Sequence, residues 1–300
     1  MLKYVLFHLF KKLSSYFYFA FGPTISNKLA MSPLGKGIFR IATGIKKSIT
    51  IKTRYDFLIN LSTYNYLMCG YFFMGETNPY ETKVLRETLK SGDIFFDIGA
   101  HIGWYSLNAA QIVGEKGKVI AFEANPNCFA DLGKNKGLNK FNNITIEKIA
   151  ITNKNTRLDF WVGDDMGGSL IQKNTTRLTI GKRIKKIKVA AQTLDNYCKK
   201  HSIKRINLIK IDVEGAEMRV LQGAKLILKN FSPDIIIEWI DVTFQADNTN
   251  KEEFISFFSS YGYYPYTFTS KGLSPYSLGQ PQETINIYFS KKYFTKKRQQ

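Results

Sequence analysis

The sequence has few cysteines and few histidines, and neither kind is clustered. Cys69, Cys128 and Cys198 are far apart and form no CxxC pair, and the three histidines are scattered as well. Such spacing argues against a disulfide framework and against a zinc site, and it is typical of a protein from a reducing compartment. We therefore expect a cytoplasmic protein.

Acidic residues are absent from the first 54 residues, which contain ten lysines and arginines. The last ten residues, 291–300, are basic again, and the formal net charge of the chain is +19. Two basic ends favour contact with an anionic surface, which can be a membrane, a nucleic acid or an acidic glycan. Lysines that are simply solvated explain the same pattern, so the charge alone leaves the partner open.

Long apolar runs are missing as well. From Leu2 to Phe17 apolar residues recur at helical spacing, but Lys11 and Lys12 interrupt them long before the roughly 20 apolar residues that a membrane span needs. No small-residue cleavage site follows. We interpret this segment as a basic amphipathic helix that either contacts the inner face of an anionic membrane peripherally or packs on its own domain.

The feature around which the chain is organised is the stretch from Ile94 to Tyr105, IFFDIGAHIGWY. Its apolar run ends at Asp97, glycines follow at Gly99 and Gly103, and a helical pattern begins at Trp104. This order is typical of a buried strand that leads through a tight turn into a helix. A dinucleotide site needs three glycines in the pattern GxGxxG. This turn has two glycines with an acid in front of them, so it favours a ligand with a positive end.

From Ile94 onward, strand-like and helical segments alternate. The alternation predicts an α/β fold with a doubly wound, mostly parallel seven-stranded sheet and an antiparallel strand at its C-terminal end. A β-hairpin is expected as an insertion before the fourth strand, within residues 157–190. The expected strands are 94–97, 118–123, 144–149, 208–212, 235–238, 263–268 and 285–289, and the expected helices are 81–89, 104–113, 128–138, 216–228 and 251–261.

Acidic residues stand where four of the first five strands end. Asp97, Glu123 and Glu238 end the first, second and fifth strands, and Asp212 and Glu214 close the fourth. Open parallel sheets bind their ligands at this edge. Glu123 can accept two hydrogen bonds from ribose hydroxyls, and Asp97 suits a positive charge. S-adenosylmethionine is a nucleoside with a positive charge and no phosphates, and it is the cofactor we expect.

Three motifs resemble those of the FkbM-type methyltransferases. They are FFDIGAHIGWYSL at residues 95–107, IAFEANP at 120–126 and IKIDVEGAEMRVLQGA at 209–224. The resemblance covers residues 79–289 and implies an S-adenosylmethionine-dependent methyltransferase with the Rossmann-like class I fold. We accordingly divide the chain into a basic N-terminal extension with an amphipathic helix (1–78), a methyltransferase domain (79–290) and a basic tail (291–300).

The resemblance also implies roles for individual residues around the cofactor. Asp97 and the turn after it would line the methionine end, Glu123 would hold the ribose, and the next residues would flank the adenosine. The end of the third strand, near Ile149, lacks an acid or an amide, so adenine would meet backbone groups there. The expected cofactor-binding residues are Asp97, Gly99, Ala100, His101, Gly103, Glu123, Ala124, Asn125 and Ala150.

Asp212 and Glu214 are the expected catalytic residues, either as an acid/base pair or as a substrate-positioning pair. A hydroxyl acceptor must lose its proton near the methyl group. Asp212 and Glu214 follow the fourth strand, which we expect to end beside the methyl group. His101 and Glu238 are further candidates for this role. Glu217 fits a solvated helix face, because acids in the first turn are stabilised by the helix dipole. Without a clear third ligand beside the acids, we predict no metal site.

The resemblance favours O-methylation of a hydroxyl on a sugar, a glycan or a glycan precursor. Six aromatic residues suit either stacking on a sugar ring or packing in the core. They are Trp239, Tyr261, Tyr263, Tyr264, Tyr266 and Phe268. The charge suggests an RNA methyltransferase as the alternative. No RNA-binding module and no Asn/Asp-Pro-Pro-Tyr motif is present, however, so nucleic acid is not the expected partner. A further alternative is a non-catalytic, membrane-associated binding protein with this fold, and the oligomeric state stays open.

Overall fold

The computed structural model describes residues 32–43, 48–62, 68–76, 78–163, 167–178, 183–280, 282 and 284–292. The chain divides into two compact units, of which the first contains residues 1–79 and 134–140 and the second contains the rest. The expected N-terminal amphipathic helix and most of the basic tail lie outside the described residues. Within these residues no helix combines the length and the apolar character needed to cross a membrane.

The first unit contains a β-hairpin and short helices. Its two strands pair antiparallel, with Ile51 opposite Ile59. Phe39 and Phe72 pack edge to face in its core, with ring centroids 5.0 Å apart. Its elements are α3 (Pro33–Thr43), β1 (Ser48–Lys52), β2 (Leu58–Ser62) and α4 (Cys69–Met74).

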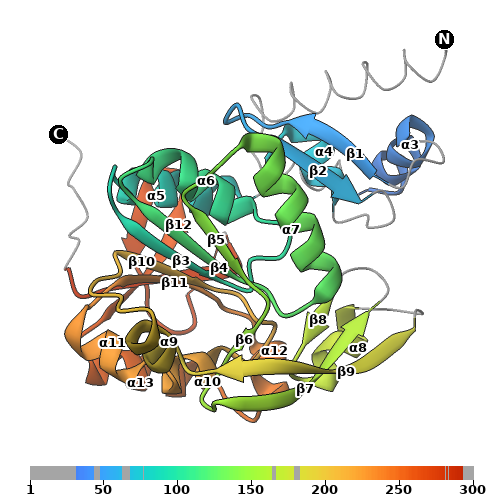
Figure 1. Cartoon of the computed structure of the whole chain (residues 1–300). Helices are drawn as coiled ribbons and strands as arrows, with labels where there is room; N and C mark the ends of the chain where they lie inside the picture. Colours follow the sequence, from blue (N-terminus) through green and yellow to red (C-terminus); the bar gives the residue numbers. More distant parts are fainter. Residues whose placement is uncertain are drawn as a thin grey trace. The chain divides into compact units, whose positions relative to one another are not determined.

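The second unit is built on an eight-stranded sheet with the order β13-β12-β14-β11-β10-β3-β4-β5 (Figure 1). The strands from β11 to β5 run parallel, and β14 lies antiparallel between β11 and β12. The predicted doubly wound sheet and its antiparallel C-terminal strand are therefore confirmed. The strands are β3 (Ile94–Ile98), β4 (Lys118–Phe122), β5 (Ile144–Glu147), β10 (Leu208–Ile211), β11 (Asp234–Glu238), β12 (Tyr264–Thr269), β13 (Gly272–Pro275) and β14 (Asn286–Ser290).

The prediction of seven strands was one strand short. The additional strand, β13, follows β12 after a two-residue turn and pairs with it antiparallel, with Phe268 opposite Leu273. Residues 272–275, GLSP, contain a glycine and a proline, which are both rare in strands, so the sequence gives no strand signal there. The short strand is formed through its pairing with β12.

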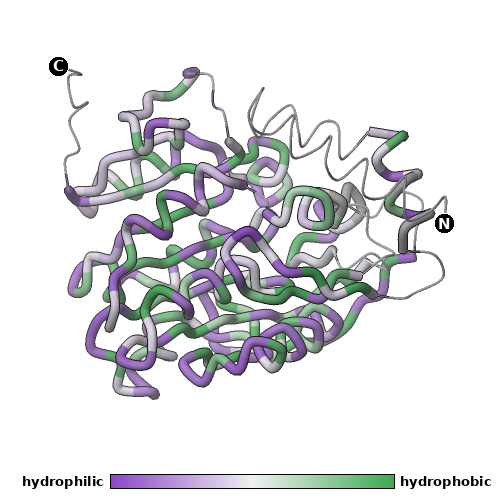
Figure 2. The backbone as a smooth tube through the Cα atoms, turned by 90° about the horizontal axis from the view of Figure 1, so that it is seen from above, coloured by the Kyte–Doolittle hydropathy of each residue, from purple (hydrophilic) through white to green (hydrophobic). Residues whose placement is uncertain are grey.

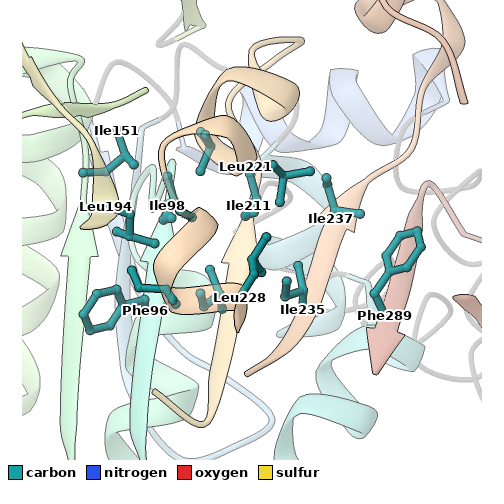
Figure 3. Packing of buried hydrophobic residues seen from close by; sticks show 14 of the residues in the cluster. Phe96, Ile98, Ile151, Leu194, Ile211, Leu221, Leu228, Ile235, Ile237 and Phe289 are labelled. Atoms are coloured by element: carbon teal, nitrogen blue, oxygen red, sulfur yellow. The ribbon is translucent and has the colours of Figure 1, made fainter. Parts of the chain in front are cut away.

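The central strands are apolar because helices cover both faces of the sheet. Figure 3 shows one face, where Phe96, Ile98, Ile211, Ile235 and Ile237 are packed together with residues from the covering helices. The helices on this face are α9 (Leu194–Lys200), α10 (Glu217–Gln222), α11 (Lys225–Asn230), α12 (Asp241–Ala246) and α13 (Lys251–Ser260). Hydrophobic and hydrophilic stretches alternate along the chain in Figure 2, as expected for helices that bury one side.

The opposite face of the sheet carries α5 (Pro79–Thr88) and α6 (Trp104–Val113). These two helices are joined by a hydrogen bond from Trp104 Nε1 to Thr82 Oγ1 of 3.0 Å. Side chains of α6 reach the sheet, since Ser106 bonds Asp97 of β3 and the ring of Tyr105 lies under the ammonium of Lys210 on β10. This face of the sheet therefore carries the charged side chains of Asp97 and Lys210, which belong to the candidate functional site. The remaining long helix, α7 (Pro126–Asn139), follows β4.

The single helix predicted over 216–228 is two helices, α10 and α11, which separate at Gly223. A Cβ atom at Gly223 would lie 2.1 Å from the carbonyl oxygen of Thr152. Glycine at position 223 thus allows another segment to approach closely where the two helices separate, and sequence periodicity cannot show such an approach. The helices α9 and α12, together with α8 (Gln172–Leu178), were not predicted.

The inserted hairpin is confirmed and is larger than predicted. Its strands β7 (Thr156–Gly163) and β9 (Ile184–Gln192) form a four-stranded sheet with β6 (Ala150–Ile151) and β8 (Gly168–Ser169), in the order β6-β9-β7-β8. The helix α8 lies between β8 and β9 in the chain. The first part of the loop before β8, residues 164–166, lies outside the described residues.

Candidate functional site

The turn after β3 brings three strand ends together. Gly99 has φ +83°, and a Cβ atom there would lie 1.7 Å from the carbonyl oxygen of Asp212, which follows β10. The N–H groups of Gly99 and Ala100 both donate to the carbonyl oxygen of Phe122, the last residue of β4, at 3.0 Å. Only glycine fits between the turn and β10, so the motif glycine fixes how closely these strand ends approach.

Glu123 joins this turn to the segment after β4. Its Oε2 accepts the N–H of His101 at 2.7 Å, and its Oε1 accepts the N–H of Asn125 at 2.7 Å. The side chain is buried, and this burial raises the pKa of its carboxyl to about 7. Each oxygen has a second lone pair, so the carboxylate can still accept hydrogen bonds from a ligand.

Asp97 lies beneath the same turn and is 1% exposed. Its Oδ2 accepts the hydroxyl of Ser106 at 2.5 Å. In the parallel pairing of β3 with β10, Asp97 lies opposite Lys210, which is fully buried. Burial raises the pKa of Asp97 to about 6, although Ser106 and the ammonium of Lys210 oppose the rise. Asp97 is therefore a buried support of the turn, and the Lys210 ammonium offsets only part of the cost of burying its charge.

Small residues from three elements meet beside Glu123. Ala124 after β4, Ala150 at the start of β6 and Ala216 before α10 belong to one buried cluster. Phe160 of β7 and Leu170 after β8 belong to the same cluster and come from the inserted sheet. Ala150 thus does not end a strand of the main sheet, as the sequence suggested, but begins a strand of the small sheet. The structure nevertheless brings it to the neighbourhood predicted for it.

Asp212, Glu214 and Glu238 lie at the ends of β10 and β11. One carboxylate oxygen from each of them is within 4.8 Å of the other two. Lys210 Nζ binds Oδ2 of Asp212 at 3.0 Å, and the Asp212 side chain is 33% exposed. The predicted pair of acids is therefore joined by a third acid. His101, the other candidate for proton transfer, has its pKa lowered by burial and so favours the neutral imidazole.

Glu217 is not on a solvated helix face, contrary to the sequence prediction. It is fully buried, and its Oε1 accepts the N–H groups of Val213 and Gly215 at 3.0 and 3.1 Å. Burial raises the pKa of its carboxyl to about 7. The side chain turns back on its own N-terminal loop instead of pointing to water, because that loop has backbone donors to satisfy.

The aromatic residues proposed for sugar stacking belong mainly to the core. Trp239, Tyr263, Tyr266 and Phe268 are each no more than 2% exposed. Tyr264 is the exposed member, at 47%. Four of the six aromatic side chains proposed for stacking are thus unavailable to an acceptor in this conformation.

Lys210 and Ser169 are site residues that the sequence reasoning missed. A lysine in a short apolar strand gives no sign that it will be fully buried, and its partner Asp212 is only two residues away. Ser169, from the inserted sheet, donates its hydroxyl to the carbonyl oxygen of Glu214 at 2.9 Å. Ser169 ends the stretch GGS at residues 167–169, and the contact shows that this stretch packs on the turn after β10.

The raised pKa of Asp97 predicts how stability changes with pH. A carboxyl with a pKa raised from 3.8 to about 6 keeps its proton to higher pH in the folded state than in the unfolded state. The contribution of Asp97 to stability is therefore greatest at low pH and is lost as the pH rises through 6. The full cost is about 3 kcal/mol. We expect the free energy of unfolding of Asp97→Asn to fall less than that of the wild type between about pH 4.5 and pH 7.5. Urea denaturation at both pH values measures this, and an equal fall in both proteins would contradict it.

Known sequences are similar to the part of the chain that contains this site. The profile of the methyltransferase FkbM domain matches residues 97–265. The 2-O-methyltransferase NoeI of Sinorhizobium fredii (strain NBRC 101917 / NGR234) is 30% identical over 146 residues, which cover 45% of this chain and 59% of NoeI. The chain therefore matches less than two thirds of the length of this relative.

Solved structures with a similar arrangement are more distant. The methyltransferase FkbM from Methylobacillus flagellatus KT aligns with a TM-score of 0.44 and 15% identity, over 75% of this chain and 53% of that chain. A SAM-dependent methyltransferase from Aquifex aeolicus aligns with a TM-score of 0.39 and 14% identity, over 69% of this chain and 87% of that chain.

Proposed function

This chain belongs to the FkbM methyltransferase domain family, and from that membership we propose that it transfers a methyl group from S-adenosylmethionine to a hydroxyl group. The match includes the turn after β3, Glu123 and the acids after β10. All three features lie at the carboxyl ends of parallel strands, where open α/β sheets bind ligands.

The observation that carries the cofactor assignment is the position of Glu123. Its two oxygens are fixed by the N–H groups of His101 and Asn125, so the carboxylate is held rigidly at the end of β4. A ribose with two neighbouring hydroxyls is the ligand that suits its remaining lone pairs. Gly99, Ala100 and Gly103 would then face the methionine part, above the buried carboxyl of Asp97.

Ala124, Asn125 and Ala150 would flank the adenosine. All three residues are buried. The two alanines are small, and the Asn125 side chain is fixed because its Oδ1 accepts the N–H of Asn127 at 3.0 Å. The cluster that contains Ala124 and Ala150 also contains Phe160 from the inserted sheet. We infer that the inserted sheet closes one side of the cofactor site, and that adenine meets apolar side chains and backbone groups there.

Methyl transfer is an in-line displacement. The acceptor oxygen bonds to the methyl carbon while the bond from this carbon to sulfur breaks, and the electron pair turns the sulfonium into a neutral thioether. The protein therefore has to align the acceptor with the methyl group and exclude water. The proton of the hydroxyl must pass to a base, which contributes about 10²–10⁴-fold.

Asp212 and Glu214 are the groups that we assign to the acceptor. Asp212 follows the strand next to the turn, and Lys210 binds one of its oxygens, Oδ2. The other oxygen can accept a hydrogen bond or a proton from the acceptor. The Glu214 carboxylate lies within 4.8 Å of that of Asp212, so both can contact one hydroxyl-bearing molecule.

We propose a sugar, glycan or glycan precursor as the acceptor. The printed name of the relative NoeI, a 2-O-methyltransferase, supports transfer to oxygen. The many carboxylates beside the methyl position suit neutral hydroxyls, because sugar hydroxyls donate hydrogen bonds to acids. Peripheral contact with an anionic membrane stays a prediction, since the segment from Leu2 to Phe17 lies outside the described residues.

The proposal predicts transfer of a labelled methyl group to glycans. The full chain is incubated with S-adenosylmethionine labelled in the methyl group and with glycans extracted from a strain that lacks this protein. We expect label in glycan hydroxyls as methyl ethers, identified by mass spectrometry, and none in RNA from the same strain. Label in RNA alone would overturn the glycan assignment, and absence of label from both would count against the acceptor class.

A further inference from the structure

Three carboxylates converge at the carboxyl ends of two neighbouring strands. Asp212 follows β10, Glu214 lies in the turn after it, and Glu238 is the last residue of β11, which pairs in parallel with β10. One oxygen from each carboxylate lies within 4.8 Å of the other two. Two oxygens on opposite sides of one cation are about 4.8 Å apart on Ca²⁺ and about 4.2 Å apart on Mg²⁺. The upper bound on the spacing is therefore compatible with a shared divalent cation, and the smaller ions require the carboxylates to be closer than this bound.

Glu238 is the member of this cluster that points to a ligand. It is 4% exposed, and its Oε2 has no hydrogen-bond partner among the residues that the structure describes. Burying a carboxylate oxygen without a partner is costly. A cation bound at this oxygen would supply the partner that the described residues do not provide.

Lys210 balances part of the negative charge. Its ammonium is fully buried and lies 3.0 Å from Oδ2 of Asp212, with the ring of Tyr105 at 5.3 Å on another side. One ammonium compensates one of three carboxylates. Glu217, which is also buried, adds to the repulsion that Glu238 experiences. A divalent cation would remove this excess of negative charge.

The turn that carries Glu214 is held by neighbouring segments. Ser169 Oγ and Asn174 Nδ2 donate to the carbonyl oxygen of Glu214 at 2.9 and 2.7 Å. On the other side of the turn, Glu217 accepts the N–H of Gly215. In metal sites, hydrogen bonds from neighbouring residues hold the ligands in position. The contacts of this turn would hold Glu214 in the same way.

We propose that Asp212, Glu214 and Glu238 bind one divalent cation of the Mg²⁺ or Mn²⁺ class. All three ligands are carboxylate oxygens, which these hard cations prefer, whereas zinc and copper sites commonly use nitrogen and sulfur. The Asp212 side chain is 33% exposed, so the ion can enter with its remaining waters. The sequence argument against a metal depended on a missing third ligand, and Glu238 supplies that ligand. The inference concerns binding and does not rest on the proposed methyl transfer.

Titration with Mn²⁺ tests the proposal directly. The full chain, freed of metal with EDTA and without S-adenosylmethionine, is titrated near pH 7.5 while electron paramagnetic resonance measures free Mn²⁺. We expect one bound Mn²⁺ per chain, displaced by Mg²⁺. Glu238→Gln should weaken the affinity for Mn²⁺ at least about tenfold. Changes of residues that only support the metal ligands already cause a loss of this size, and Glu238 is proposed as a ligand itself. Asp159→Asn, a carboxylate paired with Lys186 and Lys188 outside the site, is the control and should leave the affinity unchanged.

Two results would overturn the proposal. One is the absence of saturable Mn²⁺ binding in the wild type up to millimolar concentrations, which would mean that Glu238 keeps a proton instead. The other is equal affinity in the wild type and Glu238→Gln. Circular dichroism checks that this variant folds. If it does not fold, Glu214→Gln, at a partly exposed position, replaces it and must show the same loss. Mg²⁺ should also raise the melting temperature of the wild type but not of the folded variant.

Discussion

Gly99→Ala should lower the free energy of unfolding by about 4 kcal/mol or more, enough to prevent stable folding. Two causes add at this position. The residue has φ +83°, where an alanine is strained, and the new Cβ would lie 1.7 Å from the carbonyl oxygen of Asp212. That oxygen belongs to the backbone, so it cannot move aside as a flexible side chain would. Urea denaturation of both proteins, or loss of soluble protein on expression, measures the effect.

Gly92→Ala is the matched control for this substitution. Gly92 has φ +87°, nearly the same as Gly99, but the nearest atom to a new Cβ would be Lys116 Cβ at 4.0 Å. Only backbone strain remains there, and we expect a loss of about 1–2 kcal/mol. Equal losses at both positions would show that backbone strain alone explains why position 99 needs glycine. That result would contradict the close contact between the turn and the carbonyl oxygen of Asp212.

Glu123→Ala should weaken the binding of S-adenosylmethionine by about 1–3 kcal/mol, or roughly 5- to 150-fold. The substitution removes the proposed acceptor of the ribose hydroxyls, and it also leaves the N–H groups of His101 and Asn125 without their partner. Both losses act on the same site, since these two N–H groups hold the turn and the segment after β4. Isothermal titration calorimetry measures the affinity.

Two further variants separate these causes. Glu123→Gln keeps one oxygen to accept an N–H group, so it should lose less affinity than Glu123→Ala. Glu115→Ala removes an exposed acid between α6 and β4 and should bind the cofactor like the wild type. An affinity of Glu123→Ala equal to that of the wild type would remove Glu123 from the cofactor site.

The parallel sheet was predictable because its signal is local. Apolar runs such as that of β3 end at acids or glycines, and helical periods separate them, so strand identity and order along the chain follow from the sequence. The family was predictable from the three motifs, and the match over residues 97–265 confirms it. Two features were exceptions: β13 forms through its pairing with β12, and the close approach of Thr152 to Gly223 is a contact that periodicity does not show.

The support of the site was less predictable, because it depends on which strands are neighbours. Lys210 lies opposite Asp97 only through the pairing of β10 with β3. Glu238 joins Asp212 only because β11 pairs with β10, and the two residues are 26 positions apart in the chain (238 − 212). Sequence reasoning identified most of the acids as candidates, but it could not show that three of them meet or that a buried lysine compensates one of them.

Calorimetric titration of the wild-type chain with S-adenosylmethionine tests the central claim most directly. We propose that the turn from Gly99 to Gly103 and Glu123 together form the binding site of this cofactor. We predict saturable binding of one molecule per chain, with competition by the product S-adenosylhomocysteine. No measurable heat or competition in a chain that is folded by circular dichroism would contradict the proposed cofactor site and, with it, methyl transfer.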